Sequence, residues 1–200
     1  LTTGRQVEIG SKLGFDEGRG NATVALYDIT RKNLSMADPS RPGTTIPVGE
    51  QSSRGLELAA TWLMTNNLRL SGNWALVDAK YDKFVENVGG VGVSRAGNRP
   101  TNIPKQVGNL WVAYTPIANL EVGGDLRYVS SRYADTANTV YDDAYTLLGA
   151  YAAYTFDKRT RVTARIKNLT DKVYAESFSG SSMMYLGAPR MLDVSIQTAF

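Results

Sequence analysis

The sequence of 200 residues contains neither cysteine nor histidine. A chain without them forms no disulfide, no thiolate nucleophile, no imidazole metal site and no Ser-His or Cys-His catalytic pair. These absences exclude most hydrolase and zinc-enzyme interpretations for these residues, and no cofactor or metal site is predicted.

Long hydrophobic runs are also missing, although 42% of the residues are hydrophobic. A membrane-spanning helix needs about 20 consecutive apolar residues, and polar residues interrupt every apolar run here well before that length. Charge of one sign is not in excess either, since 22 basic residues stand against 19 acidic ones. Because the basic residues are scattered along the chain, no nucleic-acid groove is predicted.

What the sequence does contain is apolar residues at every second position, the period of a β-strand. Nine segments show this alternation: 5–15, 21–34, 50–65, 68–84, 105–115, 120–133, 142–156, 160–169 and 187–200. Short turns rich in Gly, Asn, Asp or Pro alternate strictly with longer polar connections. The short ones are 16–20, 65–67, 116–119 and 157–159, and the long ones are 35–49, 85–104, 134–141 and 170–186. This alternation predicts an all-β, antiparallel, up-and-down arrangement.

The faces of the predicted strands favour a membrane barrel over a soluble sandwich. In the last segment Leu192, Val194 and Ile196 share one face, and Asp193 and Ser195 share the other. A soluble sheet would alternate in the same way, but its strands average about 5–6 residues, whereas about 9–11 tilted residues cross a bilayer. Aromatic residues also gather at segment ends, as in the girdles of membrane barrels: Phe15, Trp62, Tyr114, Tyr128, Phe156 and Phe200.

One segment, 21–34, leaves its lipid-facing side open. Val24 and Leu26 share a face with Asp28, while Tyr27 and Ile29 share the opposite face. Either a bulge or an early exit from the lipid band would account for this pattern.

The end of the chain carries a family resemblance. The stretch 168–174 contains Asn168, Leu169, Thr170, Asp171 and Tyr174, and it is followed by Gly187, Pro189, Arg190 and a strand ending in Phe200. This pattern resembles the C-terminus of TonB-dependent outer-membrane receptors of the ferric-siderophore type. Segments 4–10, 25–33, 53–58 and 98–104 resemble other strands and loops of that family in the same order.

Part of this ending has a physical explanation. Asn168, Thr170 and Asp171 are residues that let a strand end, because their side chains bond to nearby backbone. Pro189 can open a strand without the loss of a ladder bond, and Arg190 can serve as an interfacial charge or reach lipid phosphates. The resemblance implies that Phe200 is the signal read by the barrel-assembly machinery; the alternative, compatible with it, is a girdle aromatic at the end of the strand.

The resemblance also implies a larger protein. Such receptors have about 22 strands around a plug, so nine segments are expected to form the C-terminal portion of the barrel. On this expectation residues 1–200 all belong to the barrel, and the plug domain, the remaining strands and the TonB-contacting segment lie outside them.

The function implied is uptake of a ferric siderophore or similar iron chelate across the Gram-negative outer membrane, energised through TonB, without covalent chemistry. Besides the chelate and TonB, the implied partners are outer-membrane lipid and lipopolysaccharide. Arg and Tyr near loop bases suit anionic, partly aromatic chelates, and the candidates by position are Tyr81, Arg95, Arg99, Tyr133, Tyr141 and Tyr185. The same residues could instead serve loop packing and lipopolysaccharide contact. The main alternative is a passive pore or small structural barrel; an outer-membrane enzyme and a soluble binding module are further ones.

Overall fold

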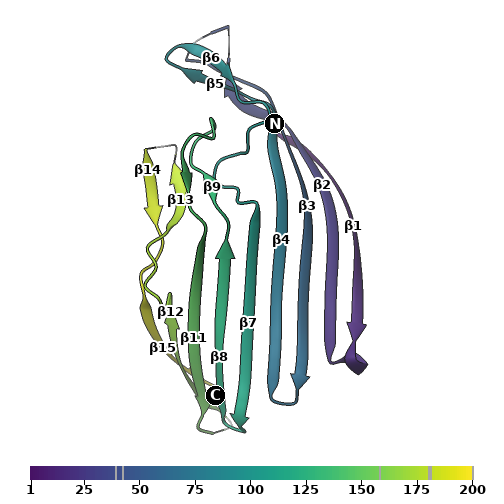
Figure 1. The fold of residues 1–200 in the computed structure, drawn as a ribbon, viewed down its shortest axis with the longest axis vertical. Helices are drawn as coiled ribbons and strands as arrows, with labels where there is room; N and C mark the ends of the chain where they lie inside the picture. The colour runs from purple at the N-terminus through teal and green to yellow at the C-terminus, as the bar shows by residue number, and fades with distance from the viewer. Residues whose placement is uncertain (39, 42, 158, 180–181, 200) are drawn as a thin grey trace.

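A curved antiparallel sheet of nine strands, joined in sequence order, forms most of the protein (Figure 1). The computed structural model describes residues 1–38, 40–41, 43–157, 159–179 and 182–199. The strands of the sheet are β1 (Thr3–Phe15), β2 (Gly20–Ala37), β3 (Thr45–Thr65), β4 (Leu68–Lys83), β7 (Gln106–Ile117), β8 (Leu120–Val129), β11 (Tyr145–Thr155), β12 (Thr160–Lys167) and β15 (Met191–Thr198). The predicted all-β class, the nine strands and their antiparallel order are confirmed.

Within the described part of the chain, β1 and β15 are the two edges of the sheet. Short turns join the strands at one end and long connections join them at the other (Figure 1). Helical structure in these residues amounts to one 3₁₀ turn, η1 (Asp16–Gly18). No helix there has the length and apolar character needed to cross a membrane.

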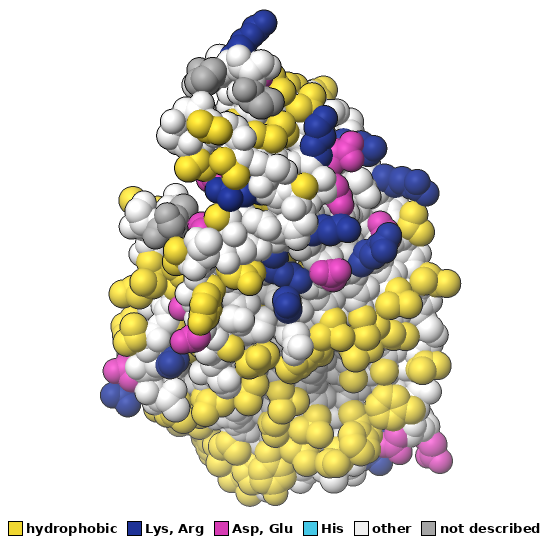
Figure 2. Space-filling view, turned by 45° about the horizontal axis from the view of Figure 1, so that its top comes forward, with side chains coloured by type: hydrophobic (Ala, Val, Ile, Leu, Met, Phe, Trp, Pro, Cys, Tyr) yellow, Lys and Arg dark blue, Asp and Glu magenta, His cyan; other side chains and the backbone are white. Residues whose placement is uncertain are grey.

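The register places like residues beside one another on each face. Leu26 of β2 lies opposite Leu56 of β3, which lies opposite Leu76 of β4. The other face is polar, as where Asn109 of β7 donates a 2.8 Å hydrogen bond to Asn73 of β4. Figure 2 shows hydrophobic side chains covering the broad lower part of the surface in view, with charged side chains gathered above them. The sheet therefore has one apolar face and one polar face.

The register also decides the orientation of the segment 21–34. Val24 pairs with Leu58 and Leu26 with Leu56, so both lie on the apolar face. Asp28 lies on that face as well, where it accepts a 2.7 Å hydrogen bond from Arg54. The strand has left the apolar band at Asp28, which is the early exit considered above; the bulges of the β2–β3 pair come later, around Leu34.

Aromatic side chains mark the short-turn end of the apolar face. The rings of Phe15 and Trp62 lie 6.1 Å apart, and those of Tyr154 and Phe156 lie 4.9 Å apart. The Trp62 indole donates a 2.8 Å hydrogen bond to Asp16 in the first turn. An apolar ring with a polar edge suits the boundary between lipid and water. Phe200 lies outside the described residues.

The long connections contain short hairpins of their own. These are β5 (Val85–Val88) with β6 (Val91–Ser94), β9 (Arg132–Tyr133) with β10 (Tyr141–Asp142), and β13 (Ala175–Ser179) with β14 (Met183–Leu186). The predicted strand 120–133 is therefore too long, because the sheet strand ends at Val129 and the chain resumes pairing as β9. The predicted 160–169 and 187–200 also extend past β12 and β15, because the chain leaves the sheet at Asn168, where φ is +48°.

Burial is concentrated beneath the connections at the long-loop end. Met36, Ala79, Val129, Ala134 and Ala175 are buried there, whereas most large apolar residues along the sheet are exposed. An exposed apolar face is stable in lipid, which solvates it without the need for a protein core.

A pair of arginine substitutions tests the assignment of the faces. Leu58→Arg puts a charge in the middle of the apolar face, so we expect it to lower the free energy of unfolding by about 2–4 kcal/mol. Guanidinium titration of the intact protein in lipid vesicles measures this change. Ala59→Arg, one position along on the polar face, is the control and should stay within about 0.5 kcal/mol of the wild type; equal losses would contradict the assignment.

Candidate functional site at the long-loop end

Three connections meet at the long-loop end, and the site is built where they touch. They are residues 95–105, residues 130–144 and residues 168–190, which lie far apart in the sequence. Side-chain bonds, described below, fasten each of them to another.

The first connection covers a free edge of β4. Strand β7 begins at Gln106, opposite Leu76, so the rest of β4 has no neighbour from the main sheet on that side. Tyr81 donates its N–H to Asn98 and accepts one from Gly97, both at 2.8 Å. The Arg99 guanidinium donates to the Val77 carbonyl at 3.0 Å. A loop thus satisfies backbone groups that a strand would otherwise pair.

Arg99 is one of the few buried charged residues, with 8% of its surface exposed. Burial lowers its pKa, although the nearby Asp78 carboxylate, 3.4 Å away, acts in the opposite direction. Its guanidinium keeps its charge, as arginine does in proteins, and it is already bonded to β4. The buried charge therefore holds the loop on the sheet.

Asn138 fastens the second connection to the first. Its side-chain oxygen accepts the Arg99 N–H at 2.8 Å, and its side-chain NH₂ donates to the Arg99 carbonyl at 2.9 Å. Asn98 adds a bond in the reverse direction, to the Thr136 carbonyl at 2.8 Å. Asn138 makes both bonds from a left-handed backbone conformation with φ of +60°, which asparagine tolerates better than most residues.

Asn102 fastens the first connection to the third in the same way. Its NH₂ donates to the Phe178 carbonyl and its oxygen accepts the Phe178 N–H, both at 2.8 Å. The backbone of Asn102 is also left-handed, with φ of +62°. Asn138 and Asn102 are the two asparagine clamps of the site, because each pairs with both backbone groups of one residue in another loop.

Arg132 lies buried between aromatic rings beside the second clamp. Its guanidinium carbon lies 5.8 Å from the ring centres of both Tyr145 and Phe178. It donates a hydrogen bond to the Ala175 carbonyl, and Asp142 lies 4.0 Å away. Cation–π contacts of this kind gain strength when they are shielded from water.

Asp135 organises the turn that presents Asn138. It accepts hydrogen bonds from the Thr139 hydroxyl at 2.6 Å and from the N–H groups of Thr139 and Val140 at 3.0 Å. Burial alone would raise the pKa of Asp135, but these hydrogen bonds outweigh it, so the pKa lies below its usual value. The carboxylate therefore stays ionised and holds the turn.

The residues that carry the family resemblance meet where the third connection leaves and rejoins the sheet. Asn168 donates to the Lys172 and Ala188 carbonyls at 2.9 and 3.0 Å, and Asp171 accepts the Arg190 N–H at 2.8 Å. The Gly187 N–H donates to the Tyr174 carbonyl at 2.9 Å. The prediction that Asn168 bonds to nearby backbone is confirmed at Lys172, whereas Asp171 bonds to Arg190, which lies 19 residues further along the chain. Leu169, Thr170 and Pro189 lie in the same crossing.

The structure separates the six predicted ligand residues into two groups. Tyr81 is buried and stacks on Phe84 at 4.5 Å, Arg95 pairs with Glu86 at 2.8 Å, and Arg99 is bonded as described. Tyr133 is half-buried in β9, whereas Tyr141 and Tyr185 are 63% and 52% exposed. A ligand role for any of the six stays a prediction, and Tyr141 and Tyr185 offer the most ring surface for one.

Four residues of this site were not predicted from the sequence: Asn102, Asn138, Arg132 and Tyr145. Asparagine in a polar connection is a signal for a left-handed turn. Nothing in the sequence indicates which distant backbone such an asparagine will pair with.

Below the loops the polar face carries further charge. A hollow of about 380 Å³ includes Glu121, Tyr151, Arg161 and Arg165 in its lining. Glu121 accepts hydrogen bonds from Arg161 at 2.9 Å and from Tyr151 at 3.1 Å, and the Arg165 guanidinium lies 5.5 Å from the Tyr151 ring. Guanidinium groups and phenol rings at the loop end and along this wall suit an anionic ligand with aromatic groups.

Comparisons with known proteins agree with this architecture. Residues 2–169 match the family model described as TonB dependent receptor-like, beta-barrel. The metal-pseudopaline receptor CntO of Pseudomonas aeruginosa is 31% identical over 198 residues, which are 96% of this chain and 27% of that receptor. The ferrichrome outer membrane transporter/phage receptor of Escherichia coli K12 is 28% identical over 94% of this chain and 25% of its own length. The siderophore receptor PiuA of Acinetobacter baumannii superposes with a TM-score of 0.83 at 27% identity, over 97% of this chain and 28% of that structure.

The sheet, with its apolar and polar faces, is therefore the wall of an outer-membrane β-barrel. The chain belongs to the family of TonB-dependent receptors, through their barrel domain. It spans about a quarter of the length of the curated relatives described here. Bacterial barrels have short periplasmic turns and longer extracellular loops, so the long-loop end is the extracellular end.

Substitution of Asn138 tests the clamp between the first two loops. Asn138→Ala leaves the Arg99 N–H and carbonyl without their partner, so we expect faster amide hydrogen exchange in 97–101 and 134–140. A local loss of about 1–3 kcal/mol corresponds to roughly 5- to 150-fold faster exchange. Mass spectrometry of exchanged peptides from the intact receptor measures it. Asn87→Ala, which removes only the 2.8 Å bond to Gly90 within the β5–β6 hairpin, should leave both segments unchanged, and similar exchange in both variants would contradict the clamp.

Substitution of Gly187 tests the crossing of the third connection. A Cβ at Gly187 would lie 1.9 Å from Cζ of the Tyr174 ring, so Gly187→Ala must displace that ring. We expect about 1–3 kcal/mol of destabilisation, measured by denaturant unfolding of the receptor. Tyr174→Ala introduced into the Gly187→Ala chain removes the clash, so the pair should be non-additive. Gly4→Ala, whose Cβ would meet only a carbonyl oxygen at 3.8 Å, is the control; additive effects at 187 and 174 would contradict the clash.

Proposed function

We propose that this chain forms the C-terminal part of the barrel of a receptor that takes up a ferric siderophore or similar iron chelate. Membership of the family supports this proposal, as do relatives whose names specify metal-pseudopaline, ferrichrome and siderophores. Nine strands are fewer than the about 22 of such transporters, so the plug and the other strands belong to the rest of the receptor.

The observation that carries the proposal is a pair of exposed tyrosines on two hairpins that are attached to the clamped loops. Tyr141 lies in β10, whose partner β9 contains the buried Arg132. Tyr185 lies in β14, whose partner β13 contains Phe178, the residue that Asn102 clamps. Each tyrosine thus belongs to a hairpin that is attached to the loop cluster, which supports the proposal that both rings contact the ligand.

Binding and release in this proposal involve no bond formation or cleavage. An anionic chelate would contact phenol rings at the mouth and meet guanidinium groups along the polar wall. Rearrangement of the plug, driven through TonB, would then release it inward. The alternative of a passive pore has no observation in its favour here, and it predicts uptake that does not depend on TonB.

The paired substitution Tyr141→Ala with Tyr185→Ala tests the proposed ligand contacts. We expect affinity for the cognate chelate to fall about tenfold or more, since loss of a buried aromatic contact commonly costs more than 1 kcal/mol. Titration calorimetry of the intact receptor with hydroxamate, catecholate and citrate-type ferric chelates identifies the class that binds and measures the loss. Tyr154→Ala, on the lipid face near the periplasmic end, is the matched control.

Radioactive iron uptake in cells with and without TonB then tests the transport step. We expect uptake of the chelate that binds to require both the receptor and TonB. Binding of no ferric chelate, or uptake that persists without TonB, would contradict the proposal and favour a pore.

A further inference from the structure

One face of the β13–β14 hairpin is apolar across both of its strands. Phe178 of β13 lies opposite Met184 of β14, and Ala175 lies opposite Leu186. Glu176 is left out of the pairing as a bulge, which brings Ala175 and Phe178 to the same side of the hairpin. Ala175, Phe178, Met184 and Leu186 thus form the apolar face of the hairpin.

The loops described above cover the β13 half of this face and leave the β14 half open. Ala175 is buried, and its carbonyl accepts a hydrogen bond from Arg132. The Arg132 guanidinium also lies against the Phe178 ring. Met184 and Leu186, in contrast, are 53% and 62% exposed, and within the described residues β14 pairs with β13 alone. The apolar face therefore ends in two uncovered side chains.

Lipid does not account for these two side chains. Between the sheet and the hairpin the chain passes through Asp171, Lys172 and Arg190, which are all exposed. Exposed charged residues at this point mark the end of the lipid-facing band, because charge on that band is costly. The hairpin lies beyond them, on the extracellular side (Figure 1). Apolar side chains that are open to water at this level indicate a contact with protein.

The strand that pairs with β15 in the closed barrel identifies the contact. Within the described residues β15 has one neighbour, β12, and lipid leaves no edge of a barrel strand unpaired. Strand β1 descends to the short-turn end as β15 does (Figure 1), so it cannot be the antiparallel neighbour of β15. On the proposed function that neighbour is a strand of the rest of the receptor. Being antiparallel to β15, it ascends toward the extracellular end and continues there into a loop.

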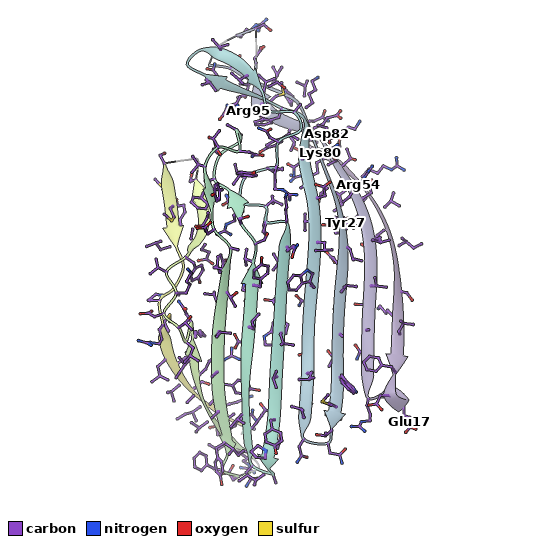
Figure 3. The ribbon with its side chains drawn as sticks, in the orientation of Figure 1. Glu17, Tyr27, Arg54, Lys80, Asp82 and Arg95 are labelled. Carbon is purple, nitrogen blue, oxygen red and sulfur yellow. The ribbon has the colours of Figure 1, made fainter. Side chains whose placement is uncertain are left out.

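Strand β14 lies on the side of the hairpin that this loop reaches. The other strand, β13, contacts the clamped loops through Ala175 and Phe178, and β14 leads into β15 through residues 187–190. Figure 3 shows β14 at the outer edge of the molecule, above β15, with β13 on the inner side. A strand that ascends along the free edge of β15 therefore ends beside Met184 and Leu186.

We propose that Met184 and Leu186 bind the extracellular loop that follows the partner strand of β15 in the rest of the receptor. This loop presents apolar side chains to the open half of the apolar face, so the closing seam of the barrel continues above the membrane as a contact between loops. Tyr185 lies on the opposite face of β14, and the contact leaves it free for a ligand. The inference rests on the proposed function in one respect, that the remaining strands belong to the rest of the receptor.

Cysteine labelling of the intact receptor on whole cells tests whether Met184 is covered. The chain has no cysteine of its own, and any cysteine elsewhere in the receptor is replaced by serine. Met183 is the matched control, because it is 53% exposed, as Met184 is, and lies on the opposite face of β14. We expect Met184→Cys to react with a membrane-impermeant maleimide about tenfold more slowly than Met183→Cys, since a covered thiol reacts only after local opening. Equal rates would overturn the proposal.

A photo-crosslinker at position 186 identifies what covers the face. Benzoylphenylalanine replaces Leu186 in the intact receptor, and mass spectrometry maps the crosslinked peptides. We expect a crosslink within one receptor chain, to the loop that follows the partner strand of β15. Crosslinks to a second copy, to lipopolysaccharide or to another protein instead would overturn the assignment. Val91, 63% exposed in the β5–β6 hairpin, is the control position and should give no crosslink to that loop.

Both measurements are made without a chelate, so their result is separate from that of the transport experiment. Uptake that requires TonB, together with no crosslink to the expected loop, would overturn this inference alone. The expected crosslink in a receptor that takes up no chelate would contradict the proposed function alone. Slow labelling of Met184→Cys only after addition of a ferric hydroxamate, catecholate or citrate would make the face a ligand contact and also overturn the inference. Resistance of the barrel to unheated detergent reports folding, and the crosslinker at Met184 gives the result if the variant at Leu186 does not fold.

Discussion

Hydrogen bonding between neighbouring strands is the constraint on which this structure depends. Lipid offers no partner to a backbone N–H or carbonyl, so every strand that crosses it must be paired on both sides. Long antiparallel strands meet that requirement, and their side chains then alternate between lipid and the barrel interior. The rows from Ile9 to Leu76 and from Leu110 to Leu148 follow from this pairing.

Where hydrogen bonding between strands ends, loops and side chains bond to the backbone groups that a strand would have paired. Above Leu76 the strand β4 has no sheet partner on one side, and residues 97–105 supply backbone groups and the Arg99 guanidinium in its place. Asn138 and Asn102 do the same between loops. Each amide side chain bonds to one backbone N–H and one backbone carbonyl, as a neighbouring strand would. The buried residues gather here because this is the part of the molecule that must pack without lipid.

Two kinds of surface result from the same sheet. The extracellular mouth is shaped by loops whose positions are fixed by clamps, with tyrosines extending from their hairpins. The outer wall is shaped by register alone, which places the Asp28–Arg54 pair directly above the leucines that face lipid. The family comparison identifies the barrel. Of these two surfaces, one faces the outside of the cell and the other faces the lipid.

The prediction from the sequence was right in the number and order of the strands, and it was less complete for their ends and for the loops, for a physical reason. A strand's period is local, so nine segments, their order and the faces of all but the segment 21–34 follow from alternation and turn residues. The bond from Asn168 to the Lys172 carbonyl was likewise predictable, because the two residues are four positions apart. The end of the predicted strand 120–133 at Val129 was not predictable, since it depends on pairing within the β9–β10 hairpin.

The sequence by itself determined that this chain is a set of alternating, membrane-length strands with polar connections at one end. Only the tertiary structure decided the face of the segment 21–34, the use of Arg99 and Arg132 as buried supports, and the partners of Asn102 and Asn138. The partner of Asn102 lies 76 residues away in the chain, and the partner of Asn138 lies 39 residues away. Periodicity records which side of a strand a residue is on, but contacts between distant loops depend on how the whole sheet curves and on which loops it brings together.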